Sequence, residues 1–194
     1  NRYRVYPDGR SSFDDVFRGV QLLTRRRVPF NILSVLTAYG ATHVRSSYRF
    51  FKQQGLRHLQ YIPCLRPFAM DAPEDLFMTD DDYAFLQQGF KLYANDALRG
   101  NPVSVRMFDN YLLLARGQNA EQCGMNGTCA TQFVVEADGS TYPCDFYCTD
   151  DWYLGNICAG DFDGFFHSEK MVEFLKNSFQ LPPACKTCRW FTLC

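Results

Sequence analysis

Two cysteine-rich runs organise this chain: CGMNGTCATQFVVEADGSTYPCDF at residues 123–146 and CKTCRWFTLC at residues 185–194. Eight of the nine cysteines lie between the start of the first run and the end of the second. Thiolate sulfur is a soft ligand that selects zinc or iron–sulfur clusters over hard cations. A Cys-x2-Cys pair such as Cys185 and Cys188 lets one short turn supply two ligands to one centre. The pattern therefore predicts a metal- or cluster-binding segment, and spacing alone does not choose between zinc and iron–sulfur.

The residues around these cysteines predict a small domain of strands and helices. Residues 133–142 contain two short strand-like runs on either side of an Asp-Gly dipeptide, which favours a hairpin with Cys144 at its exit. Ser168 is placed to cap a following helix. We expect residues 118–194 to form this cysteine-rich α+β domain.

The first part of the chain alternates between helical and strand patterns. Helical spacing of apolar residues, or short apolar runs, occurs in 12–24, 29–36, 42–54, 58–62, 79–98 and 103–107. Such alternation is typical of a parallel sheet with right-handed crossovers. At this length it is half of a barrel or of an open sheet. The expected fold class is α/β, with half of a partial (β/α) barrel in residues 1–117.

Local signals set the expected helix ends. Ser12 with Asp15, and Thr79 with Asp82, have the spacing of a capping pair. Gly55 is placed to end the second helix, because glycine adopts the left-handed conformation of a helix C-terminus without strain.

Composition and charge exclude several function classes. The chain has 194 residues and is 46% hydrophobic, enough for one or two packed domains. The formal net charge is -1 and the isoelectric point is near 6.3, so neither nucleic acid nor an anionic membrane surface is an expected partner. No apolar run has the length of a membrane span. Because the cysteines gather in one part of a chain that can build a core, thiolates on metal in a reducing cytoplasm explain them better than disulfides.

The ends of the chain indicate a piece of a longer protein. The sequence opens on Asn1 without a methionine and stops on Cys194, a predicted ligand that a frayed terminus would hold poorly. We therefore expect the natural protein to be longer than these 194 residues.

The cysteine spacing resembles the signature of the SPASM domain of radical SAM enzymes. Cys129-x9-Gly139-x4-Cys144 is followed by Cys185-x2-Cys188-x5-Cys194, and the last two cysteines of the family signature lie beyond this chain. Five strings are similar to those of the anaerobic sulfatase-maturating enzymes: CGMNGTC at 123–129, GSTYPCDF at 139–146, IPCL at 62–65, VSVR at 103–106 and RWF at 189–191. The similarity covers essentially the whole chain.

The resemblance implies a set of cofactors and ligands. In that family a partial (β/α) barrel binds S-adenosyl-L-methionine (SAM) and a [4Fe–4S] cluster, and the SPASM extension holds two auxiliary [4Fe–4S] clusters. By resemblance, ligands of the first auxiliary cluster are matched by Cys123, Cys129 and Cys144, and ligands of the second by Cys185, Cys188 and Cys194. The fourth ligand of each set is missing here. Asp145 matches the carboxylate proposed as the catalytic base, and Leu65 matches a residue that packs on the SAM nucleoside.

The activity implied is oxidation of a cysteine or serine of an unfolded sulfatase polypeptide to Cα-formylglycine. In the family, a 5′-deoxyadenosyl radical removes a hydrogen from the side-chain Cβ, a base takes the thiol or hydroxyl proton, and an electron leaves through the clusters. A carboxylate suits the base role if partial burial raises its pKa. The resemblance further implies a monomer that exchanges electrons with a flavodoxin or ferredoxin.

One departure from the family limits what these residues do alone. The Cys-x3-Cys-x2-Cys motif of the radical cluster is absent from the 194 residues, and Cys64 cannot replace it. We therefore expect the isolated chain to be inactive. Two alternatives stay open: a SPASM enzyme that modifies another peptide, for example by a thioether crosslink, and a non-catalytic zinc-binding module. The sequence does not distinguish a cysteine target from a serine target.

The other reactive residues have simpler explanations. Cys64, at the end of a strand, is expected in the core, whereas Cys148 and Cys158 match no ligand and are expected as buried free thiols or substrate-channel residues. The scattered histidines, His43, His58 and His167, are interpreted as surface or cap residues. The acidic run at 80–82 fits a helix N-terminus better than a metal site.

Overall fold

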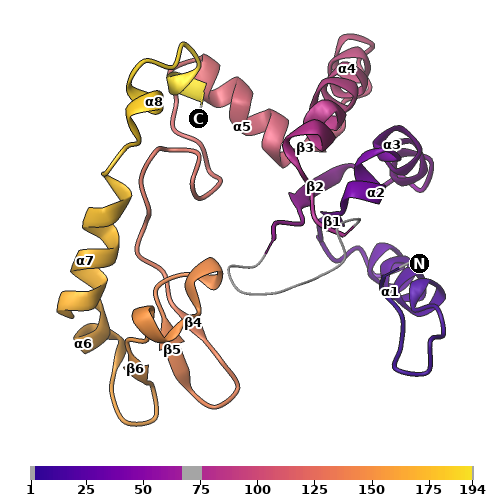
Figure 1. Ribbon diagram of the computed structural model, residues 1–194. Helices are drawn as coiled ribbons and strands as arrows, with labels where there is room; N and C mark the ends of the chain where they lie inside the picture. Colours follow the sequence, from indigo (N-terminus) through magenta and orange to yellow (C-terminus); the bar gives the residue numbers. More distant parts are fainter. Residues whose placement is uncertain (1–2, 67–75, 194) are drawn as a thin grey trace. The chain divides into compact units, whose positions relative to one another are not determined.

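A computed structural model describes residues 3–66 and 76–193 of the chain (Figure 1). They divide into two compact units, unit 1 (Asn1–Phe108) and unit 2 (Asp109–Cys194). Cys194 and most of the loop expected at 65–78 lie outside the described residues. Compactness does not test where a family domain begins, so the boundary expected at 117–118 stays a prediction. Within the described ranges, no helix combines the length and the apolar character needed to cross a bilayer.

Unit 1 contains a parallel sheet of three short strands in the order β1-β2-β3. These are β1 (Ile32–Leu36), β2 (His58–Pro63) and β3 (Ser104–Val105). Ile32 is paired with Leu59, and His58 with Ser104. The helices of unit 1 are α1 (Phe13–Arg25), α2 (Ala38–Ala41), α3 (Val44–Gln53), the 3-10 helix η1 (Asp80–Tyr83) and α4 (Ala84–Leu98), as Figure 1 shows. This order confirms the predicted alternation of strand and helix around a parallel sheet.

The core of unit 1 is formed by side chains of α3, α4, β2 and β3. The most buried include Val44, Tyr48, Leu59, Phe85 and Val105. One polar network lies among them: the Tyr48 hydroxyl donates to Asp96 Oδ2 at 3.0 Å, and Lys52 Nζ donates to Asp96 Oδ1 at 2.5 Å. A buried carboxylate needs such partners, because an unpaired charge is strongly unfavourable in an apolar interior.

All three predicted helix ends are confirmed, but one of the two expected capping pairs does not form. Asp82 Oδ2 accepts hydrogen bonds from the Thr79 N–H and hydroxyl, and Gly55 follows α3 with φ 74°. Ser12 precedes α1, but its hydroxyl donates to the Arg4 carbonyl oxygen instead of capping the helix. Its expected partner Asp15 accepts a hydrogen bond from the Tyr6 hydroxyl. Residues before α1 therefore form hydrogen bonds with Ser12 and Asp15, the two side chains that were expected to cap the helix.

The strands differ from their predicted extent. The strand expected at 103–107 is only two residues long, because Arg106 begins α5 (Arg106–Ala115). The run expected as a buried strand at 29–36 gives β1, in which Leu33 and Val35 are 62% and 61% exposed. Only one face of β1 is therefore covered. In α4 the expected core residue Leu98 is 86% exposed, and Phe85 is buried instead.

Unit 2 contains the predicted hairpin and a helix that separates the two groups of cysteines. The strands β4 (Val134–Val135), β5 (Ser140–Tyr142) and β6 (Gly155–Asn156) are antiparallel in that order. The helices are η2 (Asp145–Tyr147), η3 (Asp150–Trp152), α6 (Phe162–Phe166), α7 (Glu169–Ser178), α8 (Pro183–Lys186) and η4 (Phe191–Leu193). Ser168 caps α7 as predicted, since its Oγ accepts from the Met171 N–H at 3.2 Å.

Candidate metal centre

One cavity in unit 2 gathers cysteines from both groups. It has a volume of about 280 Å³ and is lined by Cys129, Cys185 and Cys188. The other lining residues are apolar, glycine or hydroxyl residues: Gly124, Gly127, Thr128, Ser178, Leu181 and Phe191. No Asp, Glu or His in the described part of the chain lines this cavity. The ligand type that the cavity offers is therefore thiol sulfur.

The Cys-x2-Cys pair lies on consecutive turns at α8. The Cys185 N–H donates to the Pro182 carbonyl oxygen at 2.9 Å, and the Cys188 N–H donates to the Cys185 carbonyl oxygen at 3.3 Å. The chain then turns again, with the Phe191 N–H donating to the Cys188 carbonyl oxygen at 3.1 Å. Both thiols are presented by short turns, as expected of a pair that serves one centre.

Cys123 lies in a tight turn. The Met125 N–H donates to the Gln122 carbonyl oxygen at 3.2 Å, and Gly124 has φ 84°. A positive φ at the third position of a turn requires glycine in practice. Cys123, at the second position of this turn, therefore lies on a sharply bent backbone. Cys123 is exposed and does not line the cavity.

Cys144 and Asp145 follow β5 at the exit of the hairpin. Cys144 is buried, and its thiol donates to Asp145 Oδ1 at 3.5 Å. Burial raises the pKa of the Cys144 thiol, and the neighbouring carboxylate raises it further. Asp145 is exposed on η2, so unit 2 does not supply the partial burial expected of a base.

The predicted ligands do not meet at a point. Among the described residues, no three His, Cys, Asp or Glu side chains lie close enough to hold one metal ion. Thiol sulfur is a ligand of both iron–sulfur clusters and zinc, so the chemistry of this donor set fits a cluster without choosing between the two. The cavity joins Cys129, from the first predicted set, with Cys185 and Cys188 from the second. The assignment of ligands to two clusters stays a prediction.

In unit 1, Cys64 and Leu65 lie at the carboxyl end of β2. The Cys64 N–H donates to the Leu36 carbonyl oxygen at 2.9 Å, and the Met78 N–H donates to the Cys64 carbonyl oxygen at 2.9 Å. Cys64 is half-buried, not fully in the core, and burial raises the pKa of its thiol. The Leu65 side chain is 51% exposed. Ligands of open parallel sheets bind at the carboxyl ends of the strands, and the contact of Leu65 with the SAM nucleoside stays a prediction.

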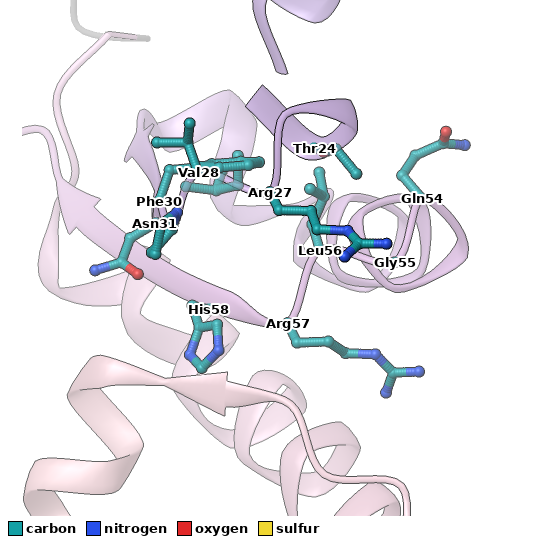
Figure 2. A pocket seen from close by; sticks show the side chains of 12 residues that line it. Thr24, Arg27, Val28, Phe30, Asn31, Gln54, Gly55, Leu56, Arg57 and His58 are labelled. Atoms are coloured by element: carbon teal, nitrogen blue, oxygen red, sulfur yellow. The ribbon is translucent and has the colours of Figure 1, made fainter. Parts of the chain in front are cut away.

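A larger cavity, of about 680 Å³, lies at the opposite ends of the strands (Figure 2). Its lining includes Ile32 and His58, the first residues of β1 and β2, together with Arg27 and Arg57. Arg57 Nη1 donates to Asn101 Oδ1 at 2.7 Å. The cavity contains no cysteine and lies at the amino ends of the strands, the face associated with stability in such folds. We therefore assign it no part in the metal chemistry.

The remaining cysteines are placed as free thiols. All eight described cysteines are without a disulfide. The Cys148 thiol donates to the Cys144 carbonyl oxygen at 3.5 Å, and Cys158 is exposed.

Sequence reasoning missed three polar residues that contact the cysteine-bearing segment. These are Asn110, Asn126 and Ser178, and their hydrogen bonds to residues 120–129 are given below. Ser178 lies 49 residues from its partner Cys129. No periodicity in the sequence predicts a hydrogen bond between residues so far apart. Asn126, in contrast, lies inside the cysteine-bearing string CGMNGTC.

Comparison with known proteins agrees with the chemistry of the cavity. Residues 123–189 match the SPASM family, described as an iron–sulfur cluster-binding domain. A cysteine-type anaerobic sulfatase-maturating enzyme of Clostridium perfringens (strain 13 / Type A) is 44% identical over 188 residues, which are 96% of this chain and 51% of that enzyme. A serine-type anaerobic sulfatase-maturating enzyme of Bacteroides thetaiotaomicron is 25% identical over 211 residues, which are 100% of this chain and 50% of that enzyme.

Solved structures match as well. Native anSMEcpe with bound AdoMet and Cp18Cys peptide has a TM-score of 0.91 and 42% identity, over 98% of this chain and 53% of that one. Histidine-tagged anSMEcpe with bound AdoMet gives the same TM-score and identity, over 98% of this chain and 50% of that one. The chain thus spans about half the length of the relatives it matches.

Proposed function

We propose that this protein is a radical SAM oxidoreductase, an anaerobic sulfatase-maturating enzyme. The chain is similar over nearly its whole length to half of such an enzyme. The substrate is a cysteine in an unfolded sulfatase polypeptide, and the product is Cα-formylglycine. The observation that carries the proposal is the cavity lined by Cys129, Cys185 and Cys188, inside the segment that matches an iron–sulfur family.

The proposed roles rest on the resemblance of each residue to a position of the family. Cys123, Cys129, Cys144, Cys185, Cys188 and Cys194 would hold two auxiliary clusters, with the missing ligands supplied from outside these 194 residues. When bound, SAM and the clusters would supply the two-electron oxidation that turns the substrate thiol into a thioaldehyde, which water then hydrolyses to the aldehyde with release of sulfide. Asp145, exposed beside Cys144, accepts the proton of the substrate thiol. Leu65, at the carboxyl end of β2, packs on the SAM nucleoside.

A cysteine target is favoured over a serine target by the comparisons. The cysteine-type relative is 44% identical and the serine-type relative 25% identical, over similar shares of the chain. We also propose that the enzyme acts as a monomer in the cytoplasm, with a flavodoxin or ferredoxin as electron partner. The gathering of the cysteines in one part of a chain that can build a core supports a reducing compartment.

The test uses the full-length protein, reconstituted anaerobically with iron and sulfide. It is incubated with SAM, a reductant and a peptide containing Cys-x-Pro-x-Arg, and the peptide is analysed for aldehyde by mass spectrometry. Aldehyde formation supports the proposal. A thioether product would identify another SPASM enzyme, and zinc retained by a colourless protein would identify a zinc module. The 194 residues alone are expected to bring about no SAM cleavage, because they lack the radical-cluster motif.

A further inference from the structure

We propose that Asn110, Asn126 and Ser178 form a clamp that holds residues 120–129 in the cluster-binding conformation before any cluster binds. The three residues are positioning residues: each acts on the backbone that carries Cys123 and Cys129. The inference deepens the proposed function and rests on it, since it assumes that these two cysteines ligate iron.

Asn126 closes the turn around Cys123. Its Oδ1 accepts from the Ala120 N–H at 2.8 Å, and its Nδ2 donates to the Ala120 carbonyl oxygen at 2.8 Å. Both polar atoms of one side-chain amide are therefore bonded to the backbone of one residue on the other side of Cys123. This pairing fixes the distance between the two ends of the turn.

Asn110 anchors the same turn to a helix. It lies on α5, is 1% exposed, and its Oδ1 accepts from the Glu121 N–H at 2.5 Å and the Gln122 N–H at 3.0 Å. These two residues directly precede Cys123. Because one buried amide oxygen accepts both hydrogen bonds, moving the backbone before Cys123 would break two bonds at once. The backbone before Cys123 is therefore held in one position.

Ser178 holds the second cysteine. At the end of α7, its Oγ donates to the Leu175 carbonyl oxygen at 2.7 Å and accepts from the Cys129 N–H at 3.1 Å. A hydroxyl has one proton, so the bond to Leu175 directs a lone pair of Ser178 at Cys129. Ser178 and Cys129 line the same cavity as Cys185 and Cys188. This hydrogen bond therefore links the first group of cysteines to the helix that leads to the second.

The segment needs a clamp because its own backbone is permissive. Gly124 and Gly127 both have positive φ, which glycine adopts as readily as negative φ. The held conformation also leaves Gln122 Oε1 buried without a hydrogen-bond partner among the described residues. An unsatisfied buried acceptor opposes this conformation, so contacts from outside the segment must stabilise it. Preorganised support of this kind around metal ligands typically changes metal affinity by about 10–100-fold.

The experiment compares variants of the full-length protein. Asn110→Ala, Asn126→Ala and Ser178→Ala remove the clamp bonds one at a time, and Ser178→Thr restores an acceptor oxygen. Asn177→Ala is the matched control, since Asn177 neighbours Ser178 but its Oδ1 accepts from Gln180 Nε2 at the surface. Two quantities are measured: hydrogen exchange of the amides at 120–129 in the metal-free protein, and iron retained after reconstitution and a chelator challenge.

We expect the alanine variants to exchange these amides faster than wild type and to lose iron about tenfold more readily, with Ser178→Thr and Asn177→Ala close to wild type. Unchanged exchange in the alanine variants would overturn the clamp, as would faster exchange with unchanged iron retention. If Asn110→Ala does not fold, Ser178→Ala and Asn126→Ala decide the question. A wild-type protein that binds no iron would contradict the proposed function, and the exchange measurement in the metal-free protein would still test the clamp separately.

Discussion

Replacing Gly155 by alanine is predicted to destabilise unit 2 through two separate effects. Gly155 has φ 141°, and a Cβ built on it would lie 2.7 Å from Phe165 Cε1 and 3.2 Å from Phe165 Cζ. Strained backbone of this kind costs about 1–3 kcal/mol. Overpacking against a buried ring adds about 1–3 kcal/mol. Because Phe165 is buried and cannot swing into solvent, we expect both effects in full, a total of about 2–6 kcal/mol.

Equilibrium urea unfolding, followed by far-UV circular dichroism, measures this loss as a lower midpoint at unchanged slope. Gly117→Ala is the matched control, because Gly117 has φ 71° and nothing lies within 4 Å of a Cβ placed there. It should lose only the conformational term, about 1 kcal/mol. Equal losses in the two variants would count against this explanation, since they would show that the close approach to Phe165 contributes nothing.

Three further predictions concern other parts of the chain. Burial alone would raise the pKa of Asp96, but the hydrogen bonds from Lys52 and Tyr48 outweigh it and hold the pKa below its usual value. The resulting stabilisation is present above pH about 4 and is lost as the pH falls through the lowered pKa. The difference in unfolding free energy between wild type and Asp96→Asn should therefore shrink below pH about 4. A difference that stays constant down to about pH 2 would contradict this assignment. Ser168→Ala should lower the free energy of unfolding by about 1 kcal/mol, because it removes the hydrogen bond from the Met171 N–H, and calorimetry would detect the shift. Asp145→Asn should reduce formylglycine formation by about 100-fold or more while leaving iron content and melting temperature unchanged, because Asp145 is exposed and an amide oxygen at this position can still accept from the Cys144 thiol. Activity near wild type would remove Asp145 from the base role.

The sequence predicted the features that depend on local spacing. The parallel alternation of unit 1, the hairpin around Asp138-Gly139 and the caps at Thr79 and Ser168 are confirmed. The Ser12 cap failed because the hydroxyl has a competing partner, the Arg4 carbonyl oxygen, which a pattern does not reveal. The early end of the strand at Val105 reflects α5, whose helical spacing starts directly after it.

The cysteine ligands of the candidate site could be predicted from the sequence, but the residues that hold these cysteines in place could not. Cysteine chemistry and spacing marked the thiols that line the cavity, because few residue types bind soft metals. The residues that hold these thiols in place could not be recognised from the sequence. Asn110 and Ser178 belong to helices distant in sequence, and their residue types are common at many helix positions that serve no site.

The uncovered face of β1 bears on how these residues are best handled in the laboratory. β1 lies at the edge of its sheet, and Leu33 and Val35 project an apolar surface there. An edge strand with exposed β-branched and aliphatic side chains is a template for pairing between copies. We therefore expect the isolated 194 residues to aggregate as concentration rises, and a lysine at position 35 to raise their solubility limit. Expression of the full-length protein is the safer route to crystals and to spectroscopy.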